Sequence, residues 1–103
     1  KLHICGNITP LLPLLVNTGA DIIDIDWMVD LDIAAKCALN KTILCGNIDP
    51  SAVMLYGSSK DVELAATRFI RSAGPRCILM PGCEIPPGTS KQNIRALKSI
   101  WGL

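Results

Sequence analysis

The sequence predicts an α/β fold in which four strands of one parallel sheet alternate with helices. Short apolar runs rich in Ile, Leu and Val alternate with segments whose apolar residues recur at helical spacing. Half of the 103 residues are hydrophobic but only 4% are aromatic, which suits strands buried on both faces. This alternation of strands and helices implies a parallel sheet whose strand–helix–strand connections are right-handed.

The expected strands are short apolar runs, and they cover residues 2–5, 21–26, 42–45 and 77–80. The expected helices cover residues 11–16, 31–39, 50 to about 56, and 60–72, and a final helix carries Ile94, Leu97, Ile100 and Trp101. Polar residues that can cap these helices precede them: Thr9, Asp30, Asp49 and Ser90. Residues that favour helix ends follow four of them: Gly19, Asn40, Gly57 and Gly74.

Two strand-to-helix turns are near copies of each other. Residues 4–10 and 44–50 share five identities in seven positions. Ordinary turn chemistry explains such a repeat. The alternative interpretation is a repeated βα unit whose turns, including Asn47, lie on one functional face.

Four βα units are half of a TIM (β/α)8 barrel, which needs about 200–250 residues. A half-barrel would leave its two outer strands as open apolar edges, which invite pairing with another chain. We therefore expect residues 1–103 to form a single domain that is a piece of a longer protein or an obligate oligomer. A small doubly wound parallel sheet is the alternative architecture.

Bulk properties exclude several classes of function. The 10 basic and 9 acidic residues give no argument for a nucleic-acid or anionic-membrane partner. No apolar run approaches the roughly 18 residues of a membrane span, and the first residues lack the pattern of a signal peptide. Five cysteines without even, close spacing do not indicate a disulfide framework, so a reducing, cytoplasmic setting is expected.

The candidate metal ligands are His3, Cys5 and Cys83. His3 and Cys5 are two residues apart, so on a strand they point to the same face, and Cys83 follows the fourth strand. Two thiolates and one imidazole can form a three-ligand zinc site whose fourth position is open to substrate. Taken singly, each of these residues also fits an ordinary packing role.

Other polar and sulfur residues have weaker assignments. Asp24 and Asp26 share a face of the second strand, and Asp26 lies at its end. Asp26 is a candidate for substrate binding or for orienting His3, Asp24 is a weaker candidate, and a solvated or capping carboxylate is the alternative for both. Cys45 occupies the strand-end position that matches Cys5 and is a lesser ligand candidate. Core or packing roles are expected for Cys37, Cys77, Trp27 and Trp101.

Four segments in order carry a resemblance to a known family: H-I-C-G-N at 3–7, D-I-D-W at 24–27, C-G-N-I-D-P at 45–50, and P-G-C-E-I-P-P-G-T-S at 81–90. They resemble the C-terminal half of the uroporphyrinogen decarboxylase superfamily, and within it the methylcobamide:coenzyme M methyltransferase branch. The resemblance implies the last four βα units of a TIM barrel. It also implies zinc bound by His3, Cys5 and Cys83.

The implied reaction moves a methyl group from a methylated corrinoid to a thiol such as coenzyme M. The implied partners are a corrinoid protein or free methylcobamide, a small thiol, and the missing N-terminal half-barrel or a second copy of the chain. Asp26, Asn47 and Glu84 are candidate substrate contacts. Glu84 also departs from the small residue expected after Cys83, and its carboxylate could compete for the metal or change its charge.

Two other functions remain as alternatives. The decarboxylase members of the superfamily carry a His near the position of Cys83, whereas His3 is the only His in this chain. The resemblance therefore argues against porphyrinogen decarboxylation without removing it as an alternative. The third hypothesis is a non-catalytic half-barrel that serves assembly.

Overall fold

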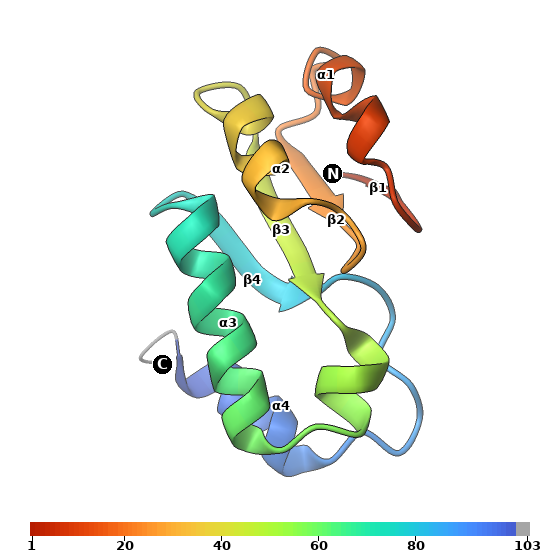
Figure 1. Ribbon diagram of the computed structural model, residues 1–103, viewed down its shortest axis with the longest axis vertical. Coiled ribbons are helices and arrows are strands. Elements are labelled where there is room, and N and C mark those ends of the chain that lie inside the picture. The colour runs from red at the N-terminus through yellow and green to blue at the C-terminus, as the bar shows by residue number, and fades with distance from the viewer. Residues whose placement is uncertain (101–103) are drawn as a thin grey trace.

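The computed structural model describes residues 1–100. It contains four parallel strands: β1 (Leu2–Ile4), β2 (Ile22–Ile25), β3 (Ile43–Ile48) and β4 (Cys77–Pro81). Their order in the sheet is β1-β2-β3-β4, the same as in the chain (Figure 1). This order is that of a barrel wall. The doubly wound alternative is wrong, because such a sheet reverses its strand order at a switch point.

The helices follow the strands as expected, with shifted bounds. They are the 3-10 helix η1 (Thr9–Leu11), α1 (Leu12–Leu15), α2 (Leu31–Ala38), the π-helix η2 (Pro50–Leu55), α3 (Ser59–Ala73) and α4 (Lys91–Ser99). Asp30, Asp49 and Ser90 cap α2, η2 and α4 as predicted. Trp101 lies outside the described residues. No helix within residues 1–100 is long and apolar enough to cross a membrane.

Two predicted boundaries are wrong for local reasons. Thr9 does not cap the first helix: its hydroxyl donates to Asn7 Oδ1 at 2.6 Å and accepts from the Asp30 N–H at 3.0 Å. The chain therefore enters α1 through a 3-10 turn. The third strand continues to Ile48, because Gly46 and Asn47 keep pairing with β4.

The two faces of the sheet have different characters. Apolar side chains of the strands pack with α2 and α3 in the core: Ile23, Ile25, Leu44, Cys77, Leu79, Ala34, Val62, Ala66 and Phe69. On the opposite face, register partners form one row across the four strands: His3, Asp24, Cys45 and Ile78. The expected core role of Cys77 is confirmed, and Cys37 packs against the core while half-buried.

The capping box at the start of α3 gives a first testable prediction. The Ser58 hydroxyl accepts from the Asp61 N–H, and the Asp61 carboxylate accepts from the Ser58 N–H. Ser58→Ala should lower the free energy of unfolding by about 1 kcal/mol, the usual value of a lost N-cap. Urea unfolding followed by circular dichroism measures this, and an unchanged midpoint would contradict it.

Candidate metal centre

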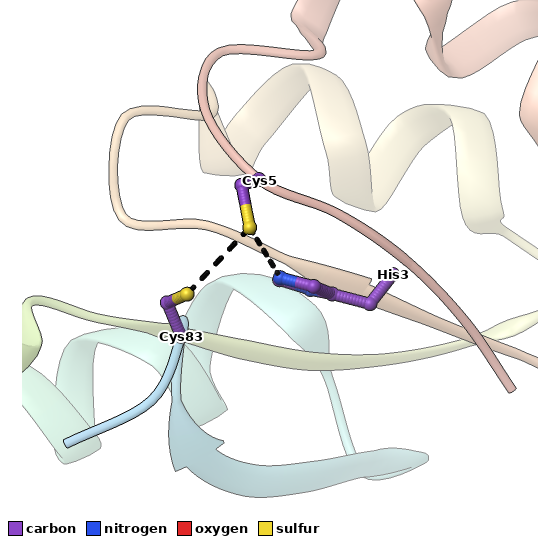
Figure 2. Close-up of side chains that lie close together, drawn as sticks. All are labelled: His3, Cys5 and Cys83. Carbon is purple, nitrogen blue, oxygen red and sulfur yellow. Dashed lines mark hydrogen bonds between the residues drawn. The ribbon is translucent and has the colours of Figure 1, made fainter.

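His3, Cys5 and Cys83 converge at the carboxyl ends of the outer strands. The Sγ atoms of Cys5 and Cys83 are 3.7 Å apart, and Cys5 Sγ is 3.3 Å from His3 Nε2 (Figure 2). One ligand atom from each residue lies within 4.8 Å of the other two, and this is the one such group of His, Cys, Asp or Glu within residues 1–100. The structure therefore brings together the three residues that the sequence singles out.

This convergence requires a curled sheet and a close crossing by the loop after β4. In a flat sheet, three steps of about 4.8 Å would place β1 and β4 about 14 Å apart. Gly82 donates its N–H to the Ile48 carbonyl at 2.8 Å. A Cβ on Gly82 would lie 2.8 Å from Trp27 N and 3.0 Å from Asp26 C. The absence of a side chain at Gly82 therefore lets this loop press against the end of β2 and carry Cys83 toward Cys5.

Asp26 connects the turn after Cys5 to the carboxyl end of β2. Its carboxylate accepts the Gly6 N–H and the Trp27 N–H, each at 2.8 Å, and the residue is buried. The hypothesis that Asp26 orients the His3 ring is thereby corrected, because both of its oxygens bind backbone N–H groups. Asp26 instead fixes the turn that follows Cys5.

The residue beside the His3 ring is Asp24. His3 Nδ1 lies 3.1 Å from the Asp24 carbonyl oxygen and 3.5 Å from its carboxylate Oδ2. Because both neighbours are acceptors, Nδ1 carries the proton when the ring is neutral, and the Nε2 lone pair faces Cys5. Lys1 Nζ also contacts Asp24 Oδ2, at 2.8 Å.

Two of the three ligand-atom distances are close to those around a zinc ion, and all three are within 4.8 Å. Zn–S bonds of about 2.3 Å and Zn–N bonds of about 2.0–2.1 Å at tetrahedral angles separate two sulfurs by about 3.8 Å, and a sulfur from a nitrogen by about 3.6 Å. The corresponding distances here are 3.7 Å and 3.3 Å. Soft sulfur donors with one imidazole favour zinc over magnesium or calcium. Cys5 is exposed and Cys83 half-buried, so the group is accessible from solvent.

The two thiols also interact electrostatically. The hydrogen bond with Cys83, and then the negative charge that its thiolate would carry, raise the pKa of Cys5. Two thiolates this close repel each other, so a divalent cation between them would favour ionisation of both. Binding of a metal by the Cys5 and Cys83 thiols should therefore release their protons.

The other candidate residues are not part of the group formed by His3, Cys5 and Cys83. Asn47 adopts a left-handed conformation (φ 69°), and its side-chain amide donates to the Asp26 and Val29 carbonyls, as expected of a turn residue. Glu84 is exposed and does not belong to the metal-ligand group. The packing role expected for Trp27 is not borne out, since the residue is 48% exposed.

Cys45 is buried in the row beside Asp24 and is not part of the ligand group. Burial, followed by the negative charge of Asp24, raises the pKa of Cys45 to about 11. Against an ordinary value of 9.0, its thiolate fraction at neutral pH is about 100-fold smaller.

Thiol labelling tests this division of the cysteines. In the folded, metal-free chain, Cys5 should react with iodoacetamide well before Cys45, because Cys5 is exposed and Cys45 is buried and protonated. Zinc should protect Cys5 and Cys83 while leaving Cys37 unaffected. Peptide mass spectrometry gives the rate at each site, and equal rates for Cys5 and Cys45 would contradict the assignment.

Two residues that build this site were underestimated from the sequence: Asp24 ranked below Asp26, and Gly82 had no assigned role. Asp24 had a detectable signal, because it is a charged residue inside the apolar run Ile22–Ile25. Gly82 also had one, since it is half of the Pro-Gly pair before Cys83, but its contact with β2 depends on how the sheet curls.

The chain is similar to known proteins along nearly its whole length. The family described as uroporphyrinogen decarboxylase (URO-D) matches residues 1–100. The methylcobamide:CoM methyltransferase MtbA of Methanosarcina mazei is 40% identical over 96 residues, which are 93% of this chain and 27% of the relative. A uroporphyrinogen decarboxylase of Prochlorococcus marinus is 37% identical over 93 residues, covering 89% of this chain and 26% of the relative.

A solved structure shares the fold. A methyltransferase from Methanosarcina mazei superposes with a TM-score of 0.86 at 26% identity, over 96% of this chain and 29% of that one. The chain thus corresponds to part of a TIM barrel and spans about a quarter of the length of the curated relatives it matches.

Proposed function

Because the chain belongs to the uroporphyrinogen decarboxylase family, we propose that it carries the zinc site of a methyltransferase that moves a methyl group from a methylated corrinoid to a thiol such as coenzyme M. One observation carries the proposal: the His3, Cys5 and Cys83 ligand atoms lie within 4.8 Å of one another. The 40% identity with a methylcobamide:CoM methyltransferase supports it.

The roles of the chain's own residues follow from their contacts. His3, Cys5 and Cys83 would hold the metal through Nε2 and two sulfurs. Asp26 and Gly82 set the two loops that present Cys5 and Cys83. Zinc bound there would supply the positive charge that keeps an acceptor thiol deprotonated near neutral pH. The open side of the group, where Cys5 is exposed, is where that thiol would enter.

The proposed partners follow from the open architecture. We assign the chain to the C-terminal half-barrel of a longer protein, because it spans about a quarter of its relatives. The edges of β1 and β4 have one strand neighbour each within residues 1–100. The N-terminal half-barrel or a second copy of the chain would cover them, and a corrinoid protein or free methylcobamide would supply the methyl group.

Metal analysis and a methyl-transfer assay test the proposal. The chain purified without chelator should contain one zinc per molecule. With methylcobamide and coenzyme M, it should form the methyl thioether faster than the Cys83→Ser variant does, and the corrinoid absorption spectrum should change in parallel. A zinc-free chain, or equal rates for the two proteins, would contradict the proposal.

Porphyrinogen decarboxylation is the second candidate, and the 37% identity with a uroporphyrinogen decarboxylase favours it. Porphyrinogen decarboxylation, however, would give no role to the Cys5 and Cys83 thiols beside the His3 ring. Release of CO2 from a porphyrinogen by the metal-free chain, at a rate unaffected by Cys83→Ser, would favour this second function.

A further inference from the structure

We propose that Asp24 is a positioning residue of the metal site: its carbonyl and carboxylate together fix the proton of His3 on Nδ1 and strengthen Nε2 as a metal ligand. This inference rests on the proposed function for its metal-binding part. The tautomer of the His3 ring does not depend on zinc and can be observed in the metal-free chain.

The first step of the argument is the geometry at His3. The ring has an acceptor pair on one nitrogen, the Asp24 carbonyl at 3.1 Å and Oδ2 at 3.5 Å, and the Cys5 sulfur at 3.3 Å from the other nitrogen. A histidine that ligates through one nitrogen is commonly oriented by a carboxylate or carbonyl on the other. Asp24 offers both groups from one position, because it is the register partner of His3.

The second step is the state of the Asp24 carboxylate. Asp24 is 5% exposed, and its Oδ1 has no hydrogen-bond partner among the described residues. A buried carboxylate with an unpaired oxygen is costly, and packing alone gives no reason for a charged residue in this apolar strand. Its Oδ2 lies 3.5 Å from Nδ1 of the His3 ring, an arrangement that favours a proton on Nδ1 and leaves Nε2 free to bind a metal.

The third step concerns the neighbours that modulate this charge. Lys1 Nζ lies 2.8 Å from Oδ2, nearer than His3 Nδ1 at 3.5 Å, and so competes with the ring for this oxygen. Cys45, on the other side of Asp24, is protonated at neutral pH and adds no charge. Lys1 should therefore weaken the effect of Asp24 on His3, and its removal should strengthen zinc binding. If Lys1 and Asp24 formed only a structural ion pair, removal of either residue should weaken zinc binding.

This difference gives two variants with opposite expected effects. Asp24→Asn keeps the shape and the backbone carbonyl but removes the charge, and it should weaken zinc affinity roughly 10- to 100-fold. Lys1→Met frees the carboxylate for His3 and should raise zinc affinity about two- to fivefold, the range for one partly exposed charge. Asp21→Asn, an exposed carboxylate near the start of β2, is the matched control and should change nothing.

A double-mutant cycle separates action through His3 from general damage. In a His3→Ala background, Asp24→Asn should cause no further loss of the remaining zinc affinity. A competition titration with a chromogenic chelator measures each affinity, and urea unfolding checks that every variant is folded. The proposal is overturned if Lys1→Met and Asp24→Asn weaken zinc binding alike, or if the loss persists in the His3→Ala background.

The metal-free chain gives an independent readout. His3 is the only histidine in the sequence, so long-range 1H–15N spectra contain one imidazole. They should show the tautomer protonated on Nδ1, with a larger Nε2–H population in Asp24→Asn. An Nε2–H ring in the unmodified chain overturns the inference even if zinc binds. If zinc does not bind but the Nδ1–H ring depends on Asp24, the proposed function fails and the positioning role of Asp24 stands.

Discussion

Replacing Cys83 with Ser should lower the zinc affinity of the chain by more than about 100-fold, beyond the roughly 10- to 100-fold typical of residues that only orient a ligand. A serine hydroxyl stays protonated at neutral pH and is a poor zinc ligand, so the site would keep one sulfur and one nitrogen. Cys5 Sγ would also lose the sulfur that now lies 3.7 Å away. Competition titration with a chromogenic chelator measures the change.

Cys37→Ser is the matched control, because Cys37 lies on α2 and is not in the metal-ligand group. It should bind zinc as the unmodified chain does. The folded state should hardly respond to Cys83→Ser in the absence of metal, since Cys83 is half-buried in a loop. If Cys83→Ser keeps the full affinity, the assignment of Cys83 as a ligand is wrong.

The second large effect is expected at Gly46. It has a φ of +102°, and a Cβ there would lie 2.4 Å from the Ile25 carbonyl oxygen and 2.7 Å from Asp24 Oδ1. Gly46→Ala therefore combines a strained backbone with a steric clash between β3 and β2. We expect a loss of about 2–4 kcal/mol in the free energy of unfolding, a large share of the stability of a small domain.

Gly19→Ala separates the two causes. Gly19 also has a positive φ, +83°, but a Cβ there would meet nothing within 4 Å. It should therefore cost only about 1 kcal/mol, the strain of the backbone alone. Urea unfolding of both variants measures the difference, and equal losses would show that the sheet accepts a side chain at Gly46.

The fold could be predicted from the sequence because its signals are local. Apolar runs, N-caps and glycines mark each βα unit, whereas the choice of sequential strand order over a doubly wound order rests on the folded sheet. The extension of the third strand to Ile48 was missed, since Gly46 and Asn47 form a turn pattern in the sequence and pair with β4 only in the folded sheet. Likewise, Thr9 has the pattern of a cap, but contacts with Asn7 and Asp30 take its hydroxyl.

The grouping of His3, Cys5 and Cys83 was also expected from the sequence, whereas most of the contacts that support it were not. The pairing of His3 with Cys5 depends on strand periodicity, which is visible in the sequence. The choice between Asp24 and Asp26 as the neighbour of His3 depends on strand register, which sequence spacing alone leaves open. The role of Gly82 depends on how closely one loop crosses the end of another strand, which is a property of the curled sheet.

X-ray absorption at the zinc edge of the metal-loaded chain tests the central claim most directly. The account predicts two sulfur ligands at about 2.3 Å and one imidazole nitrogen at about 2.0–2.1 Å, with a third sulfur after addition of coenzyme M. Cys83→Ser should reduce the sulfur count by one. A zinc ion surrounded by oxygen and nitrogen alone, or a sulfur count unchanged by Cys83→Ser, would contradict a site built from His3, Cys5 and Cys83.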